Sequence, residues 1–289
     1  MPESKPDLPV EEVVIRPSRS WFQLDLQALW HYRDMLRFLV MRDFVSKYKQ
    51  TILGPAWFVI QPLLMTLVFT VIFGRVAGLS TDGLPQPLFY LCGMLGWTYF
   101  STCFQGTSTQ LITNANLYRK VYFPRMVVPI SVVVSNLIAY AIQLVTFLCF
   151  WGYYRFFTHA GDTFGMDWTL AFLPLVILQT AAFSLGVGLW MSALTAKYRD
   201  LQQISAFLIQ VWMYVTPVIY PTSVIPEQLR WLVFLNPMAA IVEAYRGMFL
   251  GVATLTTTDV LVSATLTLLV LLSGILIFNR IQRDFVDYA

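Results

Sequence analysis

The chain has 289 residues, of which 57% are hydrophobic and only 12% charged, and its formal net charge is +3. Soluble domains average about 25% charged residues. The mean hydropathy is +0.63, and a chain this apolar has more apolar surface than a water-soluble core could bury. Composition therefore excludes a soluble globular protein. In lipid every backbone polar group needs an internal partner, and the apolar stretches are too long for barrel strands. We expect an all-α membrane protein.

Six apolar stretches are long enough to cross a hydrocarbon core, which takes roughly 20 residues of helix. In chain order we expect transmembrane helices at Pro55–Val76, Leu88–Ile112, Met126–Trp151, Leu170–Met191, Ile204–Tyr220 and Val260–Phe278. Most basic residues lie before the first span, after the sixth, and in the second-to-third and fourth-to-fifth loops. Because basic residues in short loops stay cytoplasmic, both termini are predicted to be cytoplasmic.

The segment before the first span has two parts. Residues 1–19 are rich in Pro, Glu and Ser, which predicts a disordered cytoplasmic N-terminus. Residues 20–54 mix aromatic and basic side chains and predict an amphipathic helix in the membrane interface. A soluble helix packed on a partner is the alternative. Gly54-Pro55 then turns the chain into the six-span domain, residues 55–289.

Residues of about 222–250, between the fifth and sixth spans, predict a short external helical hairpin. Its helices, Pro226–Phe234 and Pro237–Phe249, are each too short to cross the membrane. Four charged side chains make the hairpin a candidate external gate: Glu227, Arg230, Glu243 and Arg246. Glu243 and Arg246 are three residues apart and can pair on one helix face. The alternative is an external cap with only a packing role.

Catalytic motifs are absent from the sequence. It holds no G-x-x-x-x-G-K-[ST] phosphate loop, no H-E-x-x-H, no C-x-x-C and no G-x-S-x-G. Cys92, Cys103 and Cys149 have no metal-ligand spacing, so we expect no metal site. The spans lack the buried charges of ion-coupled carriers, and the short loops supply no catalytic cluster for a membrane-embedded glycosyltransferase. Energy for transport must come from a partner.

Four stretches resemble a known family. They are RDFVSKYKQTILGPAWFVIQPLLMTLVFTVIFG at residues 42–74, NANLYRKVYFPRMVVPI at 114–130, AKYRDLQQI at 196–204 and LNPMAAIVEAYRGMFLG at 235–251. Their order and places resemble those in the membrane subunits of type-2 ABC exporters. Within that group the chain is similar to permeases that export O-antigen, capsule or teichoic acid.

The resemblance implies a permease that is not itself an enzyme. Two copies would form the pore, and each would dock a separate cytoplasmic ATPase subunit that binds ATP and Mg. The complex would export polysaccharide linked to undecaprenyl diphosphate across the bacterial inner membrane, with membrane lipid as its surroundings and no nucleic-acid partner. Export of capsular polysaccharide, teichoic acid, a drug or a small lipid are the alternatives.

The loop at about 114–125 matches the family's coupling helix, which sits in a cleft of the ATPase. Aromatic residues and arginine are frequent interface hot spots. The resemblance therefore assigns ATPase contacts to Asn114, Leu117, Tyr118, Arg119, Lys120, Tyr122, Phe123 and Arg125. Ordinary anchoring by cytoplasmic basic residues is the alternative.

Two further sets of candidate residues follow from the implied substrate. Basic residues at headgroup depth attract phosphate groups. The candidate contacts to the carrier diphosphate are Arg37, Arg42, Lys47 and Lys49. The alternative is that these charges only attract anionic lipid. Aromatic rings can contact the C–H faces of sugars, although such rings are more often packing residues or interfacial belts. The candidate pore aromatics are Tyr90, Trp97, Tyr99, Phe100, Phe104, Trp212, Tyr214 and Tyr220.

Overall fold

The computed structural model describes residues 30–49, 51–120, 123–158, 161, 163–166, 168–198, 200–252 and 254–288. The predicted disordered segment 1–19, Tyr122 of the coupling loop and Arg199 lie outside the described residues, and so does the first part of the predicted interfacial helix. The described part of the chain is helical and contains no strand. The predicted all-α class is therefore confirmed.

The helices follow one another with short connections. Most are α-helices, with 3-10 turns at η1, η4 and η5 and a π-helical turn at η2. Their bounds are α2 Arg33–Tyr48, η1 Gly54–Ala56, α3 Trp57–Phe69, η2 Thr70–Val76, α4 Gln86–Thr113, α5 Ala115–Lys120, α6 Val127–Phe157, η4 Trp168–Phe172, α7 Leu173–Lys197, α8 Leu201–Val215, η5 Thr222–Val224, α9 Glu227–Phe234, α10 Pro237–Leu250 and α11 Thr257–Tyr288.

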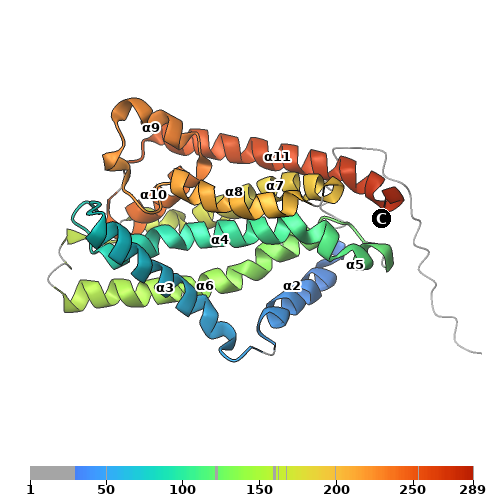
Figure 1. Ribbon diagram of the computed structural model, residues 1–289, viewed down its shortest axis with the longest axis horizontal. Coiled ribbons are helices and arrows are strands. Elements are labelled where there is room, and N and C mark those ends of the chain that lie inside the picture. Colours follow the sequence, from blue (N-terminus) through green and yellow to red (C-terminus); the bar gives the residue numbers. More distant parts are fainter. Residues whose placement is uncertain are drawn as a thin grey trace, which may run out of the picture.

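The long helices form one bundle and run along its longest axis (Figure 1). α9 and α10 lie at one end, which we call the α9 end. α2, α5 and the last turns of α11 lie at the opposite end, which we call the α5 end. The connection between α2 and α3 lies below the bundle, about midway along it (Figure 1).

α4 occupies the middle of the bundle. It packs against α7, α6, α10, α3 and α8, and most of its residues from Leu88 to Leu111 are buried. Glycines allow two of these close approaches. A β-carbon at Gly96 would lie 2.7 Å from the Tyr245 ring of α10, and one at Gly93 would lie 2.9 Å from the carbonyl oxygen of Val218. Small residues at these positions bring the hairpin down onto α4.

Four helices in the described residues are long and apolar enough to cross a membrane: Gly54–Val76, Val127–Phe157, Trp168–Lys197 and Thr257–Ile281. They correspond to the predicted first, third, fourth and sixth spans. α4 is long enough, at 28 residues, but it is more polar than those four. The predicted fifth span, Ile204–Tyr220, is a helix only to Val215, because the chain leaves the helix at Thr216-Pro217.

The short helices α9 and α10 have clear end signals. Asn236 caps α10 by accepting a hydrogen bond from the Met238 amide at 3.1 Å, and Pro237 follows in the first turn. Gly251 ends α10 with a left-handed φ of 69°. α11 then begins with a reciprocal cap between Thr256 and Asp259. Local sequence therefore defines this hairpin.

Candidate functional site

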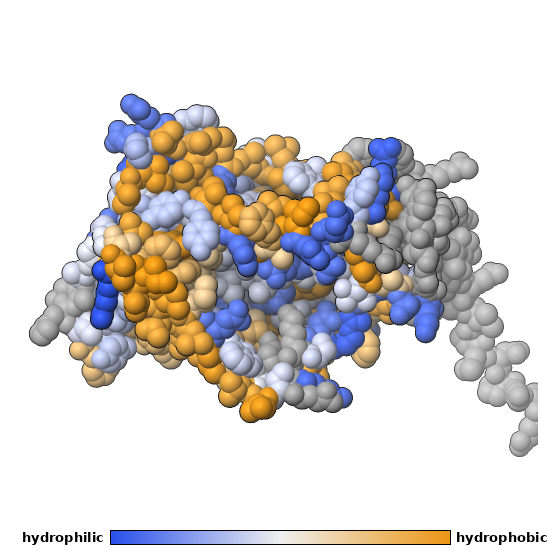
Figure 2. All heavy atoms as spheres, in the orientation of Figure 1, coloured by the Kyte–Doolittle hydropathy of each residue, from blue (hydrophilic) through white to orange (hydrophobic). Residues whose placement is uncertain are grey.

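A polar stripe follows one face of α4. Thr98, Thr102, Gln105, Thr109 and Thr113 recur every three or four residues, so they lie above one another on the helix. Thr102 and Gln105 are exposed at the protein surface. Figure 2 shows hydrophilic residues in the middle of this face, over α4, between hydrophobic surfaces. Polar side chains within a membrane bundle usually face its interior or a water-filled path.

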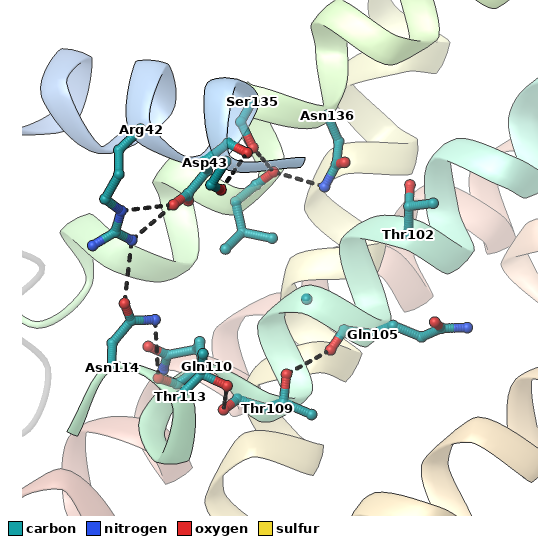
Figure 3. A pocket seen from close by; sticks show the side chains of 13 residues that line it. Arg42, Asp43, Thr102, Gln105, Thr109, Gln110, Thr113, Asn114, Ser135 and Asn136 are labelled. Carbon is teal, nitrogen blue, oxygen red and sulfur yellow. Dashed lines mark hydrogen bonds and ion pairs between the residues drawn. The ribbon is translucent and has the colours of Figure 1, made fainter. Parts of the chain in front are cut away.

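At the α5 end the stripe forms one wall of a cleft, which we call the inner cleft. Its volume is about 550 Å³. α2 contributes Arg42, Asp43 and Ser46, α6 contributes Ser135 and Asn136, and the rest of the polar lining comes from α4 (Figure 3). Among the described residues of this lining, Arg42 and Asp43 of α2 carry the charge.

Arg42 joins α2 to the end of α4. Its Nη2 donates to Asp43 Oδ1 at 2.7 Å and to Asn114 Oδ1 at 3.2 Å. Asn114 is the C-cap residue of α4, directly before α5. Arg42 Nε also donates to Asp43 Oδ1 at 3.0 Å, so the Asp43 carboxylate compensates the Arg42 charge. The Arg42 side chain is 36% exposed, and a phosphate group that reached the guanidinium could compete with Asp43 for it.

A second hollow, which we call the upper cavity, continues the inner cleft along α4. Its volume is about 430 Å³. It shares Thr102, Gln105 and Asn136 with the inner cleft and extends between α3, α4 and α6. The two hollows therefore form one polar path along the stripe of α4.

The four candidate diphosphate contacts differ in position. Arg42 lines the inner cleft. Arg37 faces away from it in a loose pair with Asp34, at 3.6 Å, and both side chains are more than three-quarters exposed. Lys49 is exposed beyond the end of α2, and the side chain of Lys47 lies outside the described residues. Among the described candidates, only Arg42 is built into the cleft.

The candidate pore aromatics fall into three groups. Tyr90, Phe100 and Phe104 are buried, and their rings contact other rings, such as Phe100 against Phe183. This arrangement supports the packing alternative for those three. Trp97 and Tyr99 line the upper cavity. In the third group, Trp212 packs on Phe100 and donates to Asn236, Tyr220 is half-buried, and Tyr214 is 56% exposed.

The coupling loop folds back onto the bundle. Phe123 is only 6% exposed and packs with Leu39 of α2. Tyr118 stacks on Phe123, its hydroxyl donates to Gln110 of α4, and Arg125 lies over its ring. Burial raises the pKa of the Tyr118 phenol, which keeps it a donor, and burial lowers the pKa of Arg125.

The outer face of α5 offers different residues from those buried in the loop. Asn116 and Lys120, four residues apart, are both exposed, while Asn114 and Leu117 are half-buried. The side chain of Arg119 lies outside the described residues. A partner that approaches the α5 end would therefore meet Asn116 and Lys120 rather than Phe123.

Glu243 and Arg246 form a buried ion pair on α10. Arg246 Nη1 lies 2.7 Å from Glu243 Oε1, and the two side chains are 2% and 4% exposed. Arg246 Nη2 also donates to the Val218 carbonyl at 2.9 Å, and its guanidinium lies 3.9 Å from the Phe89 ring centroid. Glu227 is exposed and Arg230 is half-buried on α9. The pair thus ties α10 to α4 and to the segment after α8.

Sequence reasoning gave no role to most residues of the polar path. Gln61, Asn136 and Gln143 stand out as polar residues within spans, but the stripe on α4 is the signal that could have found the groove. Its Thr and Gln residues have helical spacing in an otherwise apolar stretch. Among the described residues, no group of three or more His, Cys, Asp or Glu side chains could hold a metal ion.

The profile of one protein family, described as the ABC-2 type transporter, matches residues 35–250. The chain belongs to this family. It is therefore an integral membrane protein of the ABC-transporter permease class, and the family predicted from the four sequence stretches is confirmed. The matched region includes the inner cleft, the coupling loop and the buried Glu243–Arg246 pair.

Curated relatives match nearly the whole chain. The O-antigen export system permease protein RfbA of Myxococcus xanthus is 30% identical over 267 residues, 91% of this chain and 98% of that protein. A protein of the same name from Klebsiella pneumoniae is 26% identical over 88% of this chain and 94% of its own length. The polysialic acid transport protein KpsM of Escherichia coli is 23% identical over 72% of this chain and 78% of its own length.

The buried ion pair generates a stability prediction. Replacing one partner leaves the other charge buried and unpaired, which costs about 3–5 kcal/mol. We expect Arg246→Met and Glu243→Met each to lower the thermal unfolding midpoint of the purified protein sharply. The double variant should be less destabilised than the two single effects combined, because it leaves no uncompensated charge.

The exposed pair on α2 supplies the control. Arg37→Met removes one partner of the Arg37–Asp34 pair, which is open to solvent, and should leave the midpoint unchanged. Strictly additive effects of the two α10 substitutions would show that Glu243 and Arg246 are not energetically coupled.

Proposed function

We propose that this chain is the permease subunit of an ATP-driven exporter that moves undecaprenyl-diphosphate-linked polysaccharide, similar to O-antigen, across the bacterial inner membrane. Its relatives named for O-antigen export match nearly its full length. The observation that carries the proposal is the polar path along α4, with Arg42 in its charged end. A polymer of sugars needs such a path, and a diphosphate needs a cation at headgroup depth.

In this proposal the chain crosses the membrane six times. α4 supplies the second crossing, because 28 residues of helix extend about 42 Å and its neighbours bury most of its residues. α8 supplies the fifth, with 15 helical residues and the extended segment that follows it. The α5 end faces the cytoplasm with both termini, since α2, α5 and the end of α11 lie there together.

Transport is driven by a separate ATP-binding subunit. α5 docks on that subunit through its exposed face, Asn116 and Lys120. Its inner face contacts α4 through the hydrogen bond from Tyr118 to Gln110, a residue that also lines the inner cleft. A shift of α5 on the ATPase would therefore reach the wall of the cleft directly.

Two copies of the chain form the complete pore. The helices α3 and α8 contribute residues to the upper cavity and also carry exposed apolar side chains, among them Leu67, Phe207 and Val211. A second copy placed there would keep lipid away from the path. The polar lining also favours a polar cargo over an apolar drug, which would leave those amides and hydroxyls without partners.

Arg42 gives the first test of this proposal. In cells that lack the native gene, the unaltered chain should restore export, whereas Arg42→Gln should reduce exported polysaccharide about tenfold or more and leave the lipid-linked polymer inside. The neutral side chain cannot pair with a diphosphate. Surface polysaccharide and intracellular lipid-linked polymer are measured together.

The matched control is Arg33→Gln on the same helix. Arg33 is exposed and stacks over Trp30 rather than facing the cleft, so export should match that of the unaltered chain. Full export by Arg42→Gln, at equal protein level, would contradict the assigned role of Arg42.

Lys120 gives the second test. Lys120→Ala should reduce the amount of ATP-binding subunit that co-purifies with the chain, because it removes an exposed contact of α5. Arg75→Ala, at the α9 end of the bundle, removes a similar exposed charge and should leave co-purification intact. Equal recovery of the ATPase with both variants would show that α5 does not dock in this way.

A further inference from the structure

The upper cavity is lined mainly by apolar side chains, among which lie several polar groups but, in the described residues, no charged one. Its amides come from Gln61, Gln105, Gln143 and Asn136, and hydroxyls of Thr98, Ser101 and Thr102 join them. None of its lining residues in the described structure is Asp, Glu, Lys, Arg or His. In the inner cleft, by contrast, Arg42 and Asp43 supply charge. Among the described lining residues, charge is thus found at the α5 end of the polar path.

Several of these polar groups have no protein partner. The side-chain amides of Gln61, Gln105 and Gln143 form no hydrogen bond within the described part of the chain. Thr98 Oγ1 is buried and also has none. Two buried or half-buried amides elsewhere in the bundle are paired: Gln110 contacts Tyr118 and Ser192, and Gln179 donates to Ser263 at 2.7 Å. The side chains of Gln61, Gln105 and Gln143 can therefore bind water or a polar ligand.

Aromatic rings lie beside the unpaired amides. Trp57, Phe58, Trp97, Tyr99 and Tyr140 also line the cavity. Both tyrosine hydroxyls already donate a hydrogen bond within the protein: Tyr99 donates to the Val133 carbonyl at 3.3 Å, and Tyr140 donates to the Tyr245 hydroxyl at 3.1 Å. These rings offer flat apolar faces, and the amides offer adjacent donors and acceptors. A pyranose ring presents the matching surfaces, an apolar C–H face and a rim of hydroxyls.

The missing charge decides which sugars suit the cavity. A neutral sugar exchanges water for amide and hydroxyl partners at little cost. A carboxylate or phosphate on the sugar would lose part of its water without gaining a cation from the described lining, a cost that a neutral sugar does not have. At about 430 Å³ the cavity is within the range of about 300–1,000 Å³ typical of small-ligand sites.

We propose that the upper cavity is a glycan subsite that takes uncharged sugar units and disfavours acidic ones. This inference rests on the proposed export function and adds to it the class of polysaccharide. Arg42 in the inner cleft would hold the anionic carrier, and the sugars beyond it would meet only neutral groups.

The test compares two polymers in proteoliposomes that contain the full chain and its ATP-binding subunit. One is a lipid-diphosphate-linked polymannose and the other a lipid-diphosphate-linked polyglucuronate of equal length. The polymannose should be exported about tenfold faster or more. Gln143→Lys places a cation in the cavity and should lower that preference about tenfold. Gln105→Lys is a second variant at an exposed position, in case Gln143→Lys does not fold.

Gln228→Lys provides the matched control, because Gln228 is exposed on α9, away from the cavity. It should keep the original preference. Equal export of the two polymers by the unaltered chain would overturn the inference while leaving the export function standing. An unchanged preference in folded Gln143→Lys and Gln105→Lys complexes would overturn it as well.

A binding measurement separates the inference from the export function. Trp57 and Trp97 line the cavity, so the tryptophan fluorescence of the full chain in nanodiscs should respond to mannohexaose and not to hexaglucuronate. The response should be lost in Gln143→Leu. If this pattern holds but neither polymer is exported, the export function is wrong and the subsite stands. A response to both sugars alike would overturn the subsite.

Discussion

The constraint on which this structure depends is that a polar helix face must be kept out of lipid. α4 carries Thr102 and Gln105 on its open side and buries its other faces. A hydrocarbon environment gives these groups no hydrogen-bond partners. The helices α3, α6 and α7 cover the other faces of α4, and the polar path lies on the side of α4 that they leave open.

Both ends of α4 are tied to the elements that would control the path. At the α9 end, Gly93 and Gly96 admit α10, and the buried Arg246 holds the segment after α8. At the α5 end, Arg42 bonds to Asn114 and Tyr118 bonds to Gln110. A central helix fixed in this way can transmit a movement of α5 to the cleft without a large rearrangement of the bundle.

The sequence predicted the helices well where local signals decide them. Long apolar runs predicted the four helices that are long and apolar enough to cross a membrane. The end signals Asn236-Pro237 and Gly251 lie where α10 begins and ends. It predicted less where packing decides. Phe123 looked like an interface anchor but is buried on Leu39, and Phe100 looked like a pore residue but packs on Phe183. Aromatic residues serve both purposes, so composition alone could not separate them. The predicted fifth span was too long at its end, because the helix stops at Val215, before Thr216-Pro217.

The most direct measurement asks whether the stripe on α4 meets water. In a chain whose three cysteines are replaced by alanine, Thr102→Cys would be compared with Leu67→Cys, which lies on the exposed apolar face of α3. A hydrophilic maleimide should label Thr102→Cys at nearly the rate of a cysteine at exposed Arg33, and Leu67→Cys hardly at all. Labelling of Thr102→Cys as slow as that of Leu67→Cys would contradict a polar path along α4.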